Sequence, residues 1–476
     1  MRNGKWFGVL SFAGCLLLFM AVFLSGSIYN KILDLNGHVS MSKVTICLKE
    51  DSRTGYFSQE DINNLKKLPG IGLISCTAQQ TAIISQGNNF LAAGVAGTDE
   101  LAPMFGDMPV TGGSFFSEAD CREKSRVAVI DKDTAWKLFN NDNVIGCHVN
   151  IFGNRFKITG IIESDRSVIG KLTAGGTAKV YIPVSTFMEI NSNAGISYVQ
   201  CETDPETIIG KGADEMRIML ASIGKDPAGC IIKDYNAKGA VLAQKPDFLL
   251  FFMGLFIIFV LLSYNIKSFK KTMHNILKEC KTDYISRIIG KYRHDIVKMP
   301  ALIILTCLVS VIIWRMTRFS LFVPPGLIPD DPADISHYAG LILEKAGEAL
   351  SGGAYTVPFQ EAKSGAAEII FNVIFYTGCF LGLLFFYTGL AGLKKTCREP
   401  GKMLLVFGGF IVADLLIFVL LAYLAGFPAV VGLKDIILYW AFIFTNLTLC
   451  LHDEQSHEKI GGKGKTPADN FVSDRL

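Results

Sequence analysis

The chain has 476 residues, of which 50% are hydrophobic, 11% aromatic and only 19% charged. A mean hydropathy of +0.36 is high for a soluble protein of this length. The formal net charge of +3 leaves no basic surplus of the kind that binds nucleic acid, so no nucleic-acid partner is expected.

Six apolar runs predict an α-helical polytopic membrane protein with about six transmembrane helices. A helix rises about 1.5 Å per residue, so about 20 residues cross a hydrocarbon core of ~30 Å. The predicted transmembrane helices are 1–30, 247–266, 299–314, 369–393, 403–432 and 436–451. The third and sixth runs are only 16 residues long and either cross with tilt or local thinning or form buried or re-entrant helices.

The first run, Trp6 to Asn30, is uncharged. Its apolar region is longer than that of a signal peptide, and no small-x-small cleavage site ends it before Lys31. We therefore expect a retained membrane anchor rather than a cleaved leader.

Residues 31–246 have the dispersed apolar pattern of a large α/β domain inserted between helices 1 and 2. Helices are expected at 58–68, with Ser58 as the N-cap and a stop at Pro69-Gly70, and at 134–139. A hairpin turn is expected at 153–155. Short β-branched runs predict strands at Lys43–Leu48, Val127–Ile130, Val149–Phe152 and Phe156–Ile161.

The order of motifs in this domain resembles the extracytoplasmic core domain of MacB/FtsX-type ABC transporter permeases. The stretches GVAGTDELAPMF, GGSFFSEAD, VAVI, TAWKLF and NVIGCHVNIFGNRFKITGII follow one another as they do in that family. The matching positions are Gly94, Val95, Phe105, Gly113, Phe116, Asp120, Val127–Ile130, Ala135, Leu138, Phe139, Ile145, Gly146, Val149, Gly153, Phe156, Gly160 and Ile161. Taken singly, the glycines fit turns or close backbone contacts and the phenylalanines fit a core. The resemblance implies a family and says nothing of a substrate.

Six of the twelve cysteines fall in this domain: Cys47, Cys76, Cys121, Cys147, Cys201 and Cys230. An even count in an exported domain allows up to three disulfides. Cysteine is equally common elsewhere in the chain, so all six being free is the alternative.

The charges between the apolar runs predict the topology. Residues 267–298 carry nine basic and three acidic residues, and 394–402 carry four and one, whereas 315–368 carry four and seven. Because cytoplasmic loops collect Lys and Arg, both basic segments and both termini are expected inside, in a plasma membrane. The domain and the 315–368 loop are then extracytoplasmic.

The cytoplasmic segment 267–298 contains YISRIIGKYRHDIV, which begins at Tyr284. MacB/FtsX-type permeases have a coupling helix here, although the acidic residue of the family's "EIG" element is missing. The resemblance implies docking on an ATPase subunit through Ile285, Arg287, Ile289, Gly290, Arg293 and Ile296. The alternative is that these basic residues only set the topology.

No enzymatic site emerges from the residues. Gly464-Lys465-Thr466 resembles the end of a Walker A motif, but Lys459 stands where the first glycine is needed. His452, Asp453, Glu454 and His457 lack metal-site spacing and fit a solvated cytoplasmic tail, 452–476. We expect no catalytic residue, metal or cofactor, with ATP bound by a partner.

Two further features lie beyond the resemblance. Asp414 is the one acid inside a predicted span, where it either faces the bundle interior or lies near enough to the interface to be solvated. The external loop includes a predicted helix at 333–350, and helices 5 and 6 are additional to the family's usual four.

The resemblance implies an ABC transporter permease subunit that transmits ATP-driven motion to its external domain for export or extrusion. The expected partners are a separate ABC ATPase, a second permease copy or paralogue, the lipid bilayer and an external adaptor or hydrolase. The alternatives are an FtsX-like regulator of an external cell-wall hydrolase and a membrane-anchored sensor or scaffold without ATPase.

Overall fold

The computed structural model describes residues 2–461 except 41, 50–54, 175–177, 192–193, 204–208, 280–284, 325–330, 332–333, 341–342, 344–357 and 397–399. Of residues 2–5, 174, 285–290, 360, 395–396, 400 and 451–461 it describes the backbone alone.

Within these residues, six helical segments are long and apolar enough to cross a membrane. The first joins α1 (Arg2–Phe19) to α2 (Ser25–Leu35) through a π-helical turn, η1 (Met20–Leu24). The others are α10 (Tyr235–Glu279), α11 (Ile285–Thr317), α13 (Phe359–Thr396), α14 (Pro400–Ala425) and α15 (Leu433–Gly461). Five of the six apolar runs fall within one of them, whereas the run predicted as 403–432 extends beyond the end of α14 at Ala425, where Gly426 has a positive φ.

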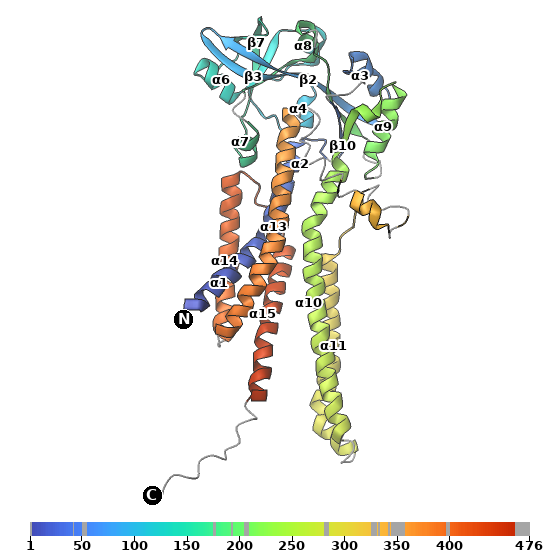
Figure 1. The fold of residues 1–476 in the computed structure, drawn as a ribbon, viewed down its shortest axis with the longest axis vertical. Helices are drawn as coiled ribbons and strands as arrows, with labels where there is room; N and C mark the ends of the chain where they lie inside the picture. Colours follow the sequence, from blue (N-terminus) through green and yellow to red (C-terminus); the bar gives the residue numbers. More distant parts are fainter. Residues whose placement is uncertain are drawn as a thin grey trace.

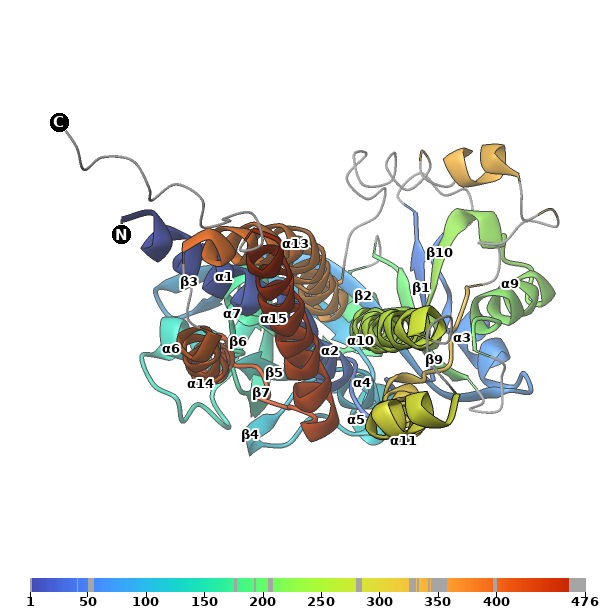
Figure 2. The same ribbon diagram turned by 90° about the horizontal axis from the view of Figure 1, so that it is seen from below.

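These helices form a pair and a larger group below a sheet domain (Figures 1 and 2). α10 and α11 lie side by side, while α1, α13, α14 and α15 pack together. α10 ends and α11 begins at the end of the helices far from the sheet, whereas α13 begins beside the sheet (Figure 1). The end of α10 and the start of α13 therefore lie at opposite ends of the helices.

Between α2 and α10 lies one sheet of ten strands, in the order β10-β1-β9-β2-β3-β8-β5-β7-β4, with β6 pairing β2 and β7. Neighbouring strands are antiparallel except β3 with β8 and β5 with β7. The strands are β1 (Lys43–Leu48), β2 (Ile71–Gln86), β3 (Asn89–Thr98), β4 (Val110–Gly113), β5 (Val127–Asp131), β6 (His148–Ile151), β7 (Asn154–Ile162), β8 (Ala178–Pro183), β9 (Tyr198–Thr203) and β10 (Cys230–Asp234).

Short helices connect and cover these strands. They are α3 (Gln59–Lys66), α4 (Ala102–Phe105), α5 (Glu118–Arg122), α6 (Lys132–Phe139), α7 (Val168–Ala174), α8 (Val184–Ile190), α9 (Gly212–Ser222) and the 3-10 turn η2 (Pro227–Gly229). The domain is thus a mixed α/β layer in which helices pack on a continuous sheet.

The local sequence signals are confirmed where they are strongest. The strand at Lys43–Leu48 has the predicted bounds. Ser58 caps α3, and its side chain and that of Asp61 each accept the other residue's backbone N–H, as a capping box does. The predicted turn at 153–155 is wrong by one position: Ile151 pairs with Asn154, so Phe152 and Gly153 form the turn, both with positive φ.

Two stretches depart from the hydropathy boundaries. α10 is 45 residues long and begins directly after β10, although its apolar run starts only at Phe248. α13 begins at Phe359, so the last ten residues assigned to the external loop are helical. Of the helix predicted at 333–350, residues 335–340 are helical and most of the remainder lies outside the described residues. All six cysteines of the sheet domain are free.

Candidate functional site: a polar joint between the sheet and two helices

The first turn of α13 reaches past the membrane helices and packs against the sheet. The Phe359 ring lies over Gly94 of β3, so close that a Cβ at Gly94 would be 2.5 Å from the ring. The Phe359 N–H donates to Gln79 Oε1 of β2 at 3.3 Å. This bond satisfies one of the free N–H groups at a helix N-terminus. α13 is therefore attached to the sheet by both an apolar and a polar contact.

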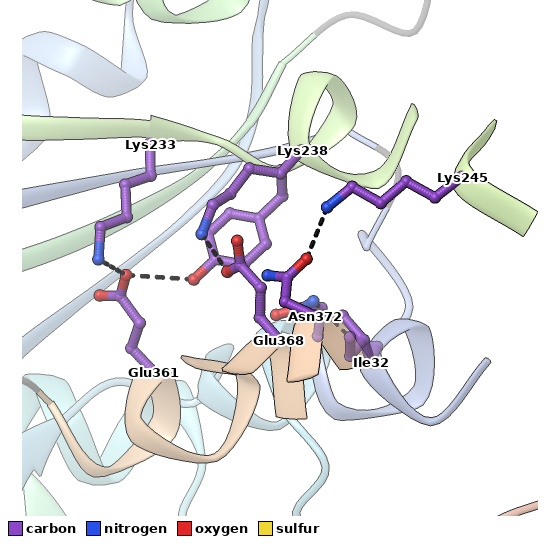
Figure 3. Close-up of polar contacts among 9 residues, drawn as sticks. Ile32, Lys233, Lys238, Lys245, Glu361, Glu368 and Asn372 are labelled. Atoms are coloured by element: carbon purple, nitrogen blue, oxygen red, sulfur yellow. Dashed lines mark hydrogen bonds and ion pairs between the residues drawn. The ribbon is translucent and has the colours of Figure 1, made fainter. Parts of the chain in front are cut away.

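Glu361, two residues further in the same turn, is the centre of the joint (Figure 3). Its side chain is buried, with the residue only 4% exposed. Its Oε1 accepts from Lys233 Nζ of β10 at 2.5 Å and from the Tyr235 hydroxyl of α10 at 3.2 Å. Its Oε2 accepts from the Cys47 thiol of β1 at 3.3 Å. One carboxylate thus joins α13 to the last strand, to an inner strand and to α10.

A buried lysine accompanies this carboxylate. Lys43 of β1 is 2% exposed and donates to the Phe105 carbonyl at 2.8 Å. Its ammonium group also lies 5.0 Å from the centre of the Tyr235 ring. Burial lowers the pKa of Lys43 to about 7, against the opposing effect of the Glu361 charge. The joint therefore contains a group whose charge is sensitive to pH near neutrality.

The contacts continue as a ladder between α10 and α13 (Figure 3). Lys238 Nζ donates to Glu368 Oε2 at 2.6 Å, and Lys245 Nζ donates to Asn372 Oδ1 at 2.6 Å. Lys238 and Lys245 are seven residues apart, which places them on one face of a helix. Glu361 and Glu368 have the same spacing on α13. Charged residues spaced seven apart next to an apolar run are a sequence signal for an extended helix, and an analysis of hydropathy alone does not detect it.

The predicted coupling residues lie at the opposite end of the molecule. α11 begins at Ile285, so the segment is helical; the side chains of Ile285, Arg287 and Ile289, and the surroundings of Gly290, lie outside the described residues. Arg293 is exposed and Ile296 is 41% exposed. Nearby, Lys291 Nζ and the Tyr292 hydroxyl donate to Glu279 Oε1 of α10 at 2.6 and 3.0 Å. Glu279 of α10 thus contacts the segment in which the acidic residue of the "EIG" element is missing.

Asp414 lies inside the helix bundle and not at its surface. It is fully buried, and neither of its carboxylate oxygens accepts a hydrogen bond within the described part of the chain. Near it, the Tyr439 hydroxyl of α15 donates to the Cys15 carbonyl of α1 at 2.6 Å. Of the two settings considered for Asp414, the structure has the bundle interior. The side chains of His452, Asp453, Glu454 and His457 lie outside the described residues.

Comparisons with known proteins match mainly the sheet domain. Residues 9–217 match the family of MacB-like periplasmic core domains. The chain is 30% identical over 132 residues to the pyoverdine export ATP-binding/permease protein PvdT of Pseudomonas savastanoi, covering 28% of this chain and 20% of the relative. It is 30% identical over 84 residues to the macrolide export ATP-binding/permease protein MacB of Syntrophobacter fumaroxidans, covering 18% and 12%.

A solved structure, the periplasmic region of MacB from Actinobacillus actinomycetemcomitans, aligns with 44% of this chain and 97% of its own length, at 18% identity and a TM-score of 0.37. The chain spans only about a fifth of the length of the first curated relatives that it matches. With six apolar spans and a periplasmic-type domain, it is a multi-pass membrane protein with an extracytoplasmic domain.

Proposed function

We propose that this chain, a MacB/FtsX-type permease by its periplasmic core domain, is the subunit of an ABC transporter that carries ATP-driven motion from a separate ATPase to its extracytoplasmic domain. A family match of this domain supports the permease assignment. The export proteins among its relatives support extrusion as the direction. The substrate is left open, because the matched relatives extend far beyond the shared region.

The observation that carries the proposal is the uninterrupted path from β10 into α10. No loop separates Asp234 at the end of the strand from Tyr235 at the start of a 45-residue helix. A displacement at the α10–α11 end therefore moves the edge of the sheet, since a helix is stiff along its axis and its first residue is fixed in the joint. Glu361 transfers the same displacement to α13 through Lys233 and Tyr235.

The proposed orientation follows from charge. The α10–α11 and α13–α14 connections carry the basic segments, and the positive-inside rule places them in the cytoplasm with both termini. The sheet, at the opposite end of the helices, is then extracytoplasmic (Figure 1). In this orientation exposed Arg293 and Ile296 face the compartment that holds ATP.

The ATP site is proposed to lie outside these 476 residues, which contain no complete Walker A motif, and a separate ABC ATPase is the proposed source of it. A second permease copy or paralogue completes the transporter, since two nucleotide-binding subunits must each meet a coupling segment. An external adaptor is a further proposed partner.

A pull-down from detergent-solubilised membranes tests the proposal. The wild-type chain is compared with Arg287→Glu/Arg293→Glu and with a matched control, Lys66→Glu/Lys171→Glu, which reverses two exposed charges of the sheet domain. We expect an ABC ATPase to copurify with wild type and control and to be lost from the first variant. Retention of the ATPase by that variant would move the contact elsewhere. Absence of any ATPase from the intact wild-type preparation would favour an anchored sensor.

A further inference from the structure

A cavity of about 100 Å³ is lined by residues of the sheet domain and of the start of α13. Its walls combine Asp131 and Lys179 of the sheet, Asp165 before α7, and Phe359 and Lys363 of α13. Exposed Asp133 and Lys137 stand at its rim, so the cavity is open to solvent.

Lys179 contributes a partly exposed ammonium group to the cavity. Its ammonium group forms no hydrogen bond or ion pair with the part of the chain that the structure describes. The Asp131 carboxylate, whose charge acts on Lys179 together with that of Asp165, already accepts the Thr134 N–H at 2.7 Å. Burial and then repulsion from Lys363 lower the pKa of Lys179. The cavity therefore presents a partly exposed cation that has no direct acceptor among the described residues, beside a second cation, Lys363.

Asp165 contributes a buried carboxylate oxygen that accepts no hydrogen bond from the described residues. Its Oδ1 accepts the Ser167 N–H at 3.0 Å. Its Oδ2 is buried and accepts no hydrogen bond from the described residues, and Lys363 Nζ approaches it only to 3.4 Å. Hydrogen bonding to Ser167 and the Lys363 charge hold the pKa of Asp165 below its ordinary value despite its burial, so the group is anionic at neutral pH. A buried carboxylate oxygen that accepts no hydrogen bond is costly even when a cation is 3.4 Å away, which points to a further donor in the cavity.

We propose that this cavity binds a small zwitterion of the size of a simple α-amino acid. The ligand carboxylate accepts from Lys179, and the ligand ammonium group donates to Asp165 Oδ2. A purely anionic ligand would face Asp131 and Asp165, and a purely cationic one would face Lys179 and Lys363, so a molecule carrying both charges complements the lining best. The cavity volume of about 100 Å³ leaves room for a small solute between Lys179 and Asp165.

The ligand would also act on the moving part of the proposed transporter. Lys363 and Phe359 belong to the first turns of α13, whereas Lys179 and Asp165 belong to the sheet domain. A bound zwitterion therefore adds contacts across the boundary between α13 and the sheet. The binding itself goes beyond the proposed transport function and does not depend on an ATPase.

Isothermal titration of the purified full-length chain in detergent tests this inference. Glycine and alanine are the probes, with acetate, methylammonium and inorganic phosphate as ligands that carry one kind of charge. We expect saturable binding of both amino acids and at least tenfold weaker binding of each single-charge probe. Lys179→Met and Asp165→Asn should each weaken amino-acid binding at least tenfold, whereas Lys66→Met, on exposed α3, should leave it unchanged.

Three outcomes overturn the proposal: no saturable binding of glycine or alanine by folded wild type, equal binding of acetate or phosphate, or full binding by Asp165→Asn. The first means that the cavity holds water only, and the second that it is an anion site. If a variant does not unfold cooperatively, it is not folded and its binding is not compared. The comparison of amino acids with single-charge probes on the wild-type chain then tests the proposal. A failed ATPase pull-down would not alter any of these readings.

Discussion

The Phe359 ring occupies the space that a side chain at Gly94 would need. The two residues are far apart in the sequence, and a Cβ at position 94 would lie 2.5 and 2.6 Å from two ring carbons. Gly94 has no positive φ, so its backbone does not require glycine. The requirement is the close approach of α13 to β3. A glycine of the family motif thus has a specific role in joining a membrane helix to the sheet.

Gly94→Val should destabilise the protein by about 1–3 kcal/mol, because overpacking forces the ring or the strand to move. Phe359→Ala should remove most of the added cost in the double variant, as measured by a thermal double-mutant cycle in detergent. Gly365→Ala is the control, since a Cβ there meets nothing within 4 Å. Additive effects of the two substitutions would contradict the contact.

Loss of the Glu361 charge should be costly. Glu361→Gln leaves Lys233 partly buried without its counter-charge, and breaking one side of a buried pair typically costs about 3–5 kcal/mol. Because Lys233 is 23% exposed on its side chain, we expect the lower end of that range. Glu118→Gln, which breaks an exposed ion pair with Arg122, should change stability by less than about 1 kcal/mol. Equal losses of stability in the two variants would show that the buried Glu361 contacts stabilise the protein no more than an exposed ion pair does.

Lys43 should make stability depend on pH above neutrality. Its pKa is about 7 in the folded protein and 10.5 when unperturbed, so between these values the unfolded chain binds more protons. The free energy of unfolding therefore rises with pH from about 7 to about 10. Lowering the pH through the same range to about 7 removes this gain. Unfolding of wild type and Lys43→Met should diverge in this window, with Lys49→Met, an exposed lysine beyond the same strand, as control. Parallel pH profiles would refute the assignment.

Asp414 should lower the stability of the helix bundle. Its buried oxygens have no hydrogen-bond partner among the described residues, and an unsatisfied buried polar group costs about 1–3 kcal/mol. Asp414→Leu should therefore raise the unfolding temperature, whereas Val412→Leu, at an exposed position of the same helix, should have little effect. A lower unfolding temperature for Asp414→Leu would reveal a supporting partner. A more stable variant that has lost transport activity would instead assign Asp414 to function.

The parts of this protein that are local in sequence were predictable from it. Apolar runs long enough to cross a bilayer form helices there, so each of the six runs corresponds to a long helix, although the run predicted as 403–432 ends in the structure at Ala425. The capping box of Ser58 and Asp61 and the strand at Lys43–Leu48 likewise depend on near neighbours. The family motifs identified the sheet domain, and the family comparison agrees.

Only the tertiary structure decided how these parts are joined. Glu361 lies 126 residues from Tyr235 and 314 from Cys47, and no local pattern records that they meet. Hydropathy placed 359–368 in a loop because its charges lowered the average, yet those charges are satisfied by the sheet and by α10, so the segment is helical. The cavity lined by Lys179 and Asp165 follows from the same docking of α13. Sequence determines which segments can cross a membrane, whereas long-range packing determines which buried charges find partners.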